Sequence, residues 1–235
     1  MTILFADPRV AAIPVHESYE SLVTLGASFG PARARVRAGL AARLRRAQAA
    51  LPVGVSLRVV EGHRSAAEQQ LIIDRYTAQV RHAYPEAAPW QRQQLVSRFV
   101  APLEVAPHVA GAAVDLTLVD RRGLPLDMGT PIDATPEESQ GRCYLDSPDL
   151  SADVRDRRAL LARVLTDAGL VNYPSEWWHW SYGDRYWALV TGADAAIYGP
   201  VVDLDRLDQA DRLAHVDGLS NVDGRGDARW GGWAA

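Results

Sequence analysis

The stretch Glu176-Trp177-Trp178-His179-Trp180 places a carboxylate three residues before a histidine and surrounds both with tryptophan. Tryptophan is large and excludes water, so we predict that Glu176 and His179 lie in a dry, well-packed environment. Such surroundings suit a general base and a metal ligand. They also suit an ordinary core, because E-x-x-H is a common pattern, and the rest of the chain has to decide between the two interpretations.

A second histidine and a second acid lie upstream, on either side of a bend. His108 is followed by Gly111, and Asp115 lies inside an alternating apolar run typical of a strand. An unpaired acid is costly to bury in a strand, and a metal ion would remove that cost. His108, Asp115 and His179 therefore form a candidate ligand set of two nitrogens and one oxygen. Three is also the number of protein ligands at a catalytic zinc. Glu176 would then be free to move protons.

Composition narrows the classes of protein to which the chain can belong. The 235 residues carry a formal net charge of -4, which gives no reason to expect nucleic acid as a partner. The single cysteine, Cys143, excludes an internal disulfide framework and a cysteine-based zinc site. No apolar run reaches the roughly eighteen residues of a membrane span. Asp7 and Pro8 precede any secretory apolar core, so we expect a cytoplasmic protein.

Apolar periodicity predicts one domain over residues 1–202 and a Gly- and Asp-rich C-terminal extension over 203–235, expected to be flexible. Within the domain, Ser65-Ala-Ala-Glu68 fits a capping box at the start of a helix. The remaining predicted elements are helices over 32–50, 91–100 and 153–168, strands over 55–60 and 112–119, and a hairpin of 177–182 with 185–190 around Gly183-Asp184.

The predicted hairpin raises a geometric problem. Residues three apart on a regular strand face opposite sides, so Glu176 and His179 share a site only if a bend near Pro174-Ser175 or a bulge intervenes. A different junction concerns Arg64, which lies between the end of a strand and the capped start of a helix. This position would hold a guanidinium ready to meet a developing negative charge, although local sequence alone favours an ordinary surface arginine.

Three motifs taken together are specific: Gly62-His63-Arg64 with Gln69, His108-x-x-Gly111-x-Ala113-x-Asp115, and Glu176-Trp-Trp-His179. They resemble the zinc D-alanyl-D-alanine dipeptidases of the VanX type, within the group of D-Ala-D-Ala metallopeptidases, lysostaphin-like enzymes and hedgehog domains. The resemblance spans residues 30–202. It implies an α+β fold in which a small antiparallel sheet carries the metal site and helices pack outside.

The resemblance also implies a function and a role for each residue of the site. One Zn2+ per chain would be bound by His108, Asp115 and His179, and Glu176 would act first as general base and then as acid. The reaction would be the hydrolysis of D-Ala-D-Ala, or of a closely related dipeptide, by metal-activated water. The partner would be this small peptide, and the oligomeric state stays open.

Two further residues take roles from the resemblance, and two departures leave the substrate open. Arg64 would steady the oxyanion, and Asp133, which ends a loop similar to the family's, would bind the ammonium of the dipeptide. However, Ala106 stands where the family usually has serine, and His63 and Ser65 replace the usual tyrosine and proline around the arginine.

Two alternative functions therefore remain open. The first is a D,D- or L,D-carboxypeptidase acting on peptidoglycan fragments, against which Asp133 and a lid-like excursion over 83–107 argue. The second is a non-catalytic zinc-binding interaction domain. Binding zinc requires neither Glu176 nor Arg64, so the presence of both favours an enzyme.

Overall fold

The computed structural model describes residues 3–201, so the expected extension over 203–235 lies outside the described residues. None of the helices described is long and apolar enough to cross a membrane. The elements, in chain order, are α1 (Pro8–Ala12), β1 (Leu22–Thr24), η1 (Ala27–Phe29), β2 (Arg35–Arg37), α2 (Ala38–Ala49), β3 (Val55–Glu61), α3 (Ala66–Ala83), α4 (Pro89–Val96), η2 (Leu103–Val105), β4 (Ala113–Asp120), α5 (Ala152–Asp167), β5 (Val171–Asn172), β6 (His179–Ser181) and α6 (Arg185–Thr191).

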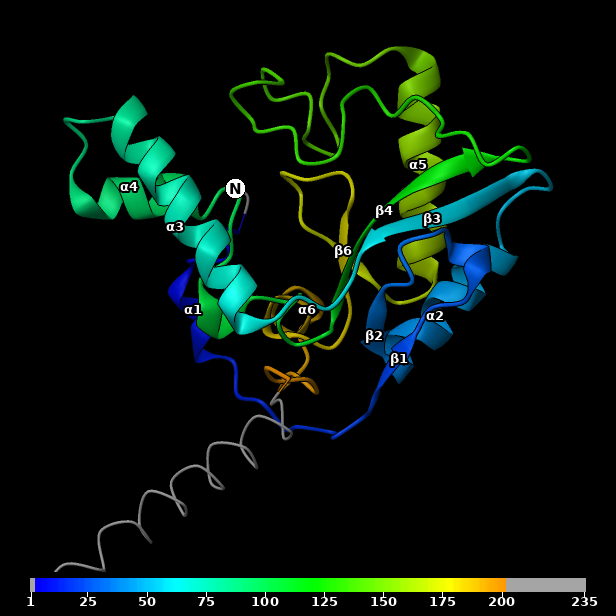
Figure 1. The fold of residues 1–235 in the computed structure, drawn as a ribbon, viewed down its shortest axis with the longest axis horizontal. Helices are drawn as coiled ribbons and strands as arrows, with labels where there is room; N and C mark the ends of the chain where they lie inside the picture. Colours follow the sequence, from blue (N-terminus) through cyan, green and yellow to red (C-terminus); the bar gives the residue numbers. More distant parts are fainter. Residues whose placement is uncertain (1–2, 202–235) are drawn as a thin grey trace, which may run out of the picture. The chain divides into compact units, whose positions relative to one another are not determined.

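A four-stranded antiparallel sheet with the order β3-β4-β6-β5 forms the centre of the fold (Figure 1). A separate pair, β1 and β2, is also antiparallel. Because both sheets are antiparallel and the helices pack outside them, the fold is α+β, and the predicted class is confirmed.

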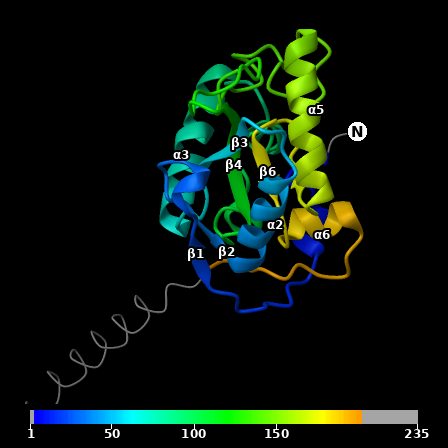
Figure 2. The ribbon, with the colours of Figure 1, turned by 90° about the vertical axis from the view of Figure 1, so that its right-hand side faces the viewer.

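The central strand β4 separates an apolar face from a polar one. Val114, Leu116 and Leu118 are fully buried in the main core, which also contains the apolar side chains of α2 and α5. Asp115 and Thr117 alternate with them and are also buried, on the other face. Figure 2 shows α2 and α5 on one side of the sheet and α3 on the other. The polar face of β4 is therefore turned away from the main core.

Helix α3 begins where the sequence predicts. The Ser65 hydroxyl accepts from the Glu68 amide at 3.2 Å, and the Glu68 carboxylate accepts from the Ser65 amide at 2.9 Å, so the capping box is present. Helix α4 packs beside α3, and together they stand as a pair apart from the sheet (Figure 1). The predicted strands over 55–60 and 112–119 and the helix over 153–168 are confirmed within one or two residues.

Two predicted elements are wrong. The segment over 185–190 forms α6 and not the second strand of a hairpin, because the Asp184 carboxylate caps the helix by accepting from the Tyr186 and Trp187 amides. The helix predicted over 32–50 begins only at Ala38, because Arg35–Arg37 pair with β1.

Candidate metal centre

Sheet register aligns two of the predicted ligands. Asp115 on β4 is paired directly with His179 on β6, so the two side chains are cross-strand neighbours on the polar face. Glu61 is paired with Asp115 from the other side, and the register shifts between Val59 and Glu61. This bulge inserts Val60 as an extra residue, which turns Glu61 from the core face to the polar face. Glu61, Asp115 and His179 therefore form one row across three strands.

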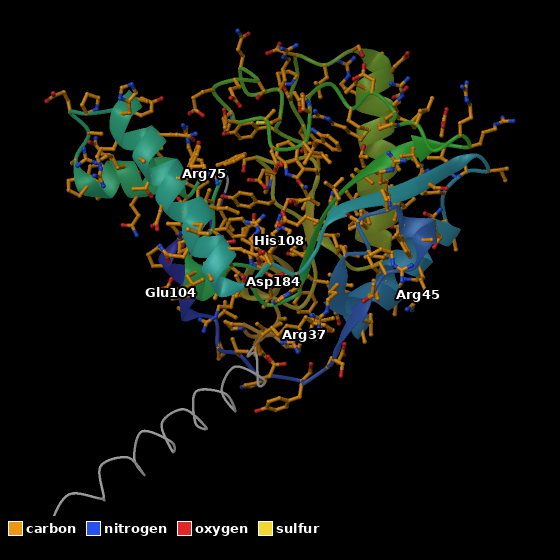
Figure 3. The ribbon with its side chains drawn as sticks, viewed as in Figure 1. Arg37, Arg45, Arg75, Glu104, His108 and Asp184 are labelled. Atoms are coloured by element: carbon orange, nitrogen blue, oxygen red, sulfur yellow. The ribbon has the colours of Figure 1, made fainter. Side chains whose placement is uncertain are left out.

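His108 reaches this row from the loop that precedes β4. Gly111 has a φ of +64°, and a Cβ there would lie 2.4 Å from the Leu22 side chain, so the bend requires glycine. The His108 ring is fixed by Nδ1, which donates to the Gly62 carbonyl at 2.7 Å. This bond leaves the lone pair of Nε2 turned towards Asp115 and His179. Figure 3 labels His108 between α3 and the central strands.

The three predicted ligand atoms form a compact, buried triangle. His108 Nε2 lies 3.1 Å from His179 Nδ1, His179 Nδ1 lies 3.1 Å from Asp115 Oδ1, and His108 Nε2 lies 3.4 Å from the same oxygen. Ligands held about 2.0–2.1 Å from a tetrahedral zinc lie about 3.3–3.4 Å apart, so the triangle fits this metal closely. All three residues are buried, and together they form a group that could hold a metal ion.

Burial and mutual charge shift the pKa values of this group. Burial by itself would raise the pKa of the Asp115 carboxyl, but the neighbouring imidazoles of His108 and His179 outweigh it and hold that pKa well below its usual range. Burial lowers the pKa of His179, against the opposing effect of Asp115. An ionised carboxylate beside a neutral imidazole is the protonation state in which both groups bind a divalent metal.

Glu176 lies beside the triangle on a turn, which solves the problem of its spacing from His179. The Glu176 amide donates to the Tyr173 carbonyl at 2.9 Å, and the Asn172 side chain donates to the carbonyls of Glu176 and His179 at 2.9 Å each. Strand β6 begins only at His179, so the bend expected near Pro174-Ser175 is present. Glu176 Oε2 lies 3.9 Å from His179 Nδ1, which places the acid next to the ligand set.

The Glu176 carboxylate is buried, and one of its two oxygens has no hydrogen-bond partner in the part of the chain that the structure describes. This atom is Oε1. Burial, together with the negative charges of Asp115 and Asp133, raises the pKa of Glu176 well above the usual value. A buried carboxylate with a free oxygen and a raised pKa has the properties of a group that accepts and returns a proton.

Arg64 lies at the same site and is held firmly. Nε donates to Glu61 Oε1 at 2.7 Å, Nη2 donates to Glu61 Oε2, and Nη1 donates to Gln69 Oε1 at 3.0 Å. Glu61 is not among the predicted site residues, although an acid three residues before a candidate catalytic arginine is a signal for such a partner. With 15% of its side chain exposed, Arg64 is not the ordinary surface arginine that local sequence favoured.

A cleft of ≈ 430 Å³ joins these groups, a volume suited to a small ligand. Its lining includes the three candidate ligands, Glu176, Arg64 and Asp133. The pKa of Asp133 is raised by burial and by the charges of Asp115 and Glu61. Phe5 also lines the cleft and stacks on Tyr173 with ring centroids 3.8 Å apart, a contribution of the N-terminal segment that no local pattern indicated.

The chain is similar to named peptidases in sequence. A sequence profile of the family described as D-ala-D-ala dipeptidase matches residues 32–193. A curated D-alanyl-D-alanine dipeptidase from Synechocystis sp. is 39% identical over 94 residues, which cover 37% of this chain and 38% of the relative. Another, from Escherichia coli K12, is 39% identical over 72 residues, covering 31% and 35%. The chain thus spans little more than a third of the length of these relatives.

Two solved structures are also similar, at 20% identity and a TM-score of 0.38 each. The first is a mutant of the vancomycin-resistance D,D-pentapeptidase VanY in complex with Zn(II), and the match covers 72% of this chain and 82% of that structure's chain. The second is VanYB in complex with D-alanine-D-alanine, at 71% and 79%. The family profile, by contrast, extends over more than half of this chain and includes the six predicted site residues, Arg64, His108, Asp115, Asp133, Glu176 and His179. The chain therefore belongs to the D-Ala-D-Ala dipeptidase family of peptidases.

Proposed function

We propose that the chain is a zinc-dependent peptidase that hydrolyses D-Ala-D-Ala or a closely related dipeptide. The observation that carries this proposal is the free Oε1 of buried Glu176, next to a ligand triangle of zinc dimensions. One Zn2+ per chain would be held by His108, Asp115 and His179. When bound, zinc supplies Lewis-acid polarisation of a carbonyl and makes water more acidic.

Glu176 moves the protons in this mechanism. Its carboxylate removes a proton from the water that attacks the scissile carbonyl carbon, and returns that proton to the nitrogen of the departing amino acid. Because one group has to accept and then donate, a pKa above the ordinary value of a glutamate is an advantage, and the raised pKa of Glu176 supports this role.

Arg64 and Asp133 act on the two charges that the substrate presents. The guanidinium of Arg64 stabilises the negative charge that develops on the scissile carbonyl oxygen, and its bonds to Glu61 fix it in place before substrate arrives. Asp133 binds the ammonium of the dipeptide from the same cleft. An acid that binds a free amine favours a dipeptide over a longer or N-blocked chain, and so favours a dipeptidase over a carboxypeptidase.

The test is release of free D-alanine from D-Ala-D-Ala before and after zinc is stripped and restored, with L-Ala-L-Ala as the stereochemical control. Glu176→Gln should bind zinc normally but lose about a hundredfold or more in kcat. The matched control is Glu104→Gln, which changes an exposed glutamate outside the cleft lining. Zinc binding without D-alanine release would contradict the proposed dipeptidase and leave a carboxypeptidase of longer peptidoglycan fragments or a zinc-binding domain.

A second comparison separates the two peptidase classes. N-acetyl-D-Ala-D-Ala lacks the ammonium that Asp133 would bind, so a dipeptidase should cleave it far more slowly than D-Ala-D-Ala. Equal rates on the two compounds would assign the chain to the carboxypeptidases that act on peptidoglycan fragments.

A further inference from the structure

Helix α3 turns one polar face to the cleft. Gln69, Ile72, Tyr76 and Gln79 recur at helical spacing and line it, and Arg75 lines it beside them. Figure 3 labels Arg75 next to α3, in the same view as His108 at the centre. The proposed mechanism gives no role to this face of the helix, although it forms one wall of the site.

Acidic residues outnumber arginines in the lining of the cleft. Five acids line it, together with only two arginines among the described residues, Arg64 and Arg75. Arg64 already donates two hydrogen bonds to Glu61. Arg75 makes no ion pair and no side-chain hydrogen bond within residues 3–201, so its guanidinium is the cation of the cleft that remains available to an anion.

A zwitterionic dipeptide brings such an anion into the cleft. Its carboxylate cannot lie beside the lining acids without a cation or a hydrogen-bond donor, because like charges at short range repel. Ala106 lines the cleft and is buried, and its methyl group offers no donor. We propose that Arg75 binds the C-terminal carboxylate of the substrate. The inference rests on the proposed function and names the residue that recognises this end of the dipeptide.

The spacing along α3 agrees with this assignment. Gln69 contacts Arg64 at 3.0 Å, and Arg75 follows six residues later, about 9 Å further along the helix axis. In an extended dipeptide the scissile carbonyl carbon and the carboxylate carbon lie only about 4 Å apart, one residue along the chain. Helical side chains lean towards the N-terminal end of their helix, so the long Arg75 side chain can cover the rest of the spacing. A substrate whose scissile carbonyl lies at Arg64 therefore extends its carboxyl end along α3 towards Arg75. With Asp133 on the ammonium and Arg75 on the carboxylate, the cleft recognises both ends of a dipeptide and so fixes the length of its substrate.

The experiment compares Arg75→Gln with Arg81→Gln, which removes an exposed arginine of the same helix that does not line the cleft. Arg75→Gln should raise KM for D-Ala-D-Ala about tenfold with kcat nearly unchanged, because a charge-assisted contact near solvent is lost in ground state and transition state alike. For D-Ala-D-alaninamide, which has no carboxylate, KM should be the same in both variants and in the wild type. The inference is overturned if Arg75→Gln and the wild type have the same KM for D-Ala-D-Ala, or if Arg75→Gln raises KM for the amide as much as for D-Ala-D-Ala.

A binding measurement separates this inference from the proposed reaction. Calorimetry with D-Ala-D-Ala on zinc-loaded Glu176→Gln protein, with and without Arg75→Gln, needs no turnover. An increase in Kd of about tenfold, absent with the amide, supports the role of Arg75 even if the wild type releases no D-alanine and the proposed function fails. No binding to either protein overturns both proposals, and equal binding to both overturns the role of Arg75 alone.

Discussion

Arg158 on α5 joins the segment 128–144, which contains Asp133, to the rest of the fold, and its replacement gives a sharp test of the structure. Its side chain is 2% exposed and donates to three main-chain carbonyls. Nε and Nη2 bind the Met128 carbonyl at 2.9 and 2.6 Å, Nη1 binds that of Tyr144 at 2.6 Å, and Nη2 also binds that of Arg142 at 2.9 Å. These carbonyls belong to the segment that contains Asp133, so Arg158 holds that segment in place.

The expected cost of Arg158→Met follows from these contacts. The Met128 carbonyl loses two buried bonds, and the carbonyls of Tyr144 and Arg142 each lose one that is partly buried. A buried polar group left without a partner costs about 1–3 kcal/mol. Burial lowers the pKa of Arg158 to about 10, which shows that the buried charge carries a desolvation penalty. The substitution removes this penalty together with the charge, and so offsets part of the stability lost with the hydrogen bonds. We expect a net decrease of about 2–4 kcal/mol in the free energy of unfolding.

Urea unfolding followed by tryptophan fluorescence measures this change. The control is Arg157→Met, because Arg157 makes one exposed bond, to the Asp127 carbonyl at 2.9 Å. The control should lie within about 0.5 kcal/mol of the wild type. Arg158→Met should also raise KM for the dipeptide, since Asp133 loses its fixed position. The reasoning is refuted if the two variants unfold at the same urea concentration.

Three further predictions concern the metal centre. A chelator should lower the Tm of the wild type, because a metal that binds only the folded state stabilises it. The same chelator should leave the Tm of His179→Ala unchanged, and an equal fall in both Tm values would remove His179 from the ligand set. In metal-free protein, burial raises the pKa of Glu176, so the stability contributed by its protonated form is lost as pH rises through that pKa. In urea unfolding, the free energy of unfolding of Glu176→Gln should therefore gain on that of the wild type as pH rises above the ordinary glutamate value of 4.5, and a constant difference would contradict the raised pKa. Glu61→Gln should lower kcat about tenfold in steady-state assays by loosening Arg64, whereas unchanged kcat would show that Arg64 is held by other contacts.

Local sequence patterns predicted the elements that form through interactions between residues close together in the chain. The alternation through Val114, Leu116 and Leu118 predicted β4 and its two faces, because strand periodicity is fixed by backbone geometry. The capping box at Ser65 predicted the start of α3, because its two hydrogen bonds join residues three apart. The sequence also predicted a set of metal ligands from the chemistry of their side chains, and the structure brings these three residues together.

Only tertiary structure decided the elements that depend on distant partners. The segment Arg35–Arg37 became β2 because it pairs with β1, and Phe5 reaches the cleft because it stacks on Tyr173, far along the chain. The bulge before Glu61 set which acid faces the cleft, and it depends on pairing with β4. Residue types determine what a site can do, because chemistry belongs to the side chain. Which side chains meet depends on register and packing between segments far apart in sequence, and no local window contains that information.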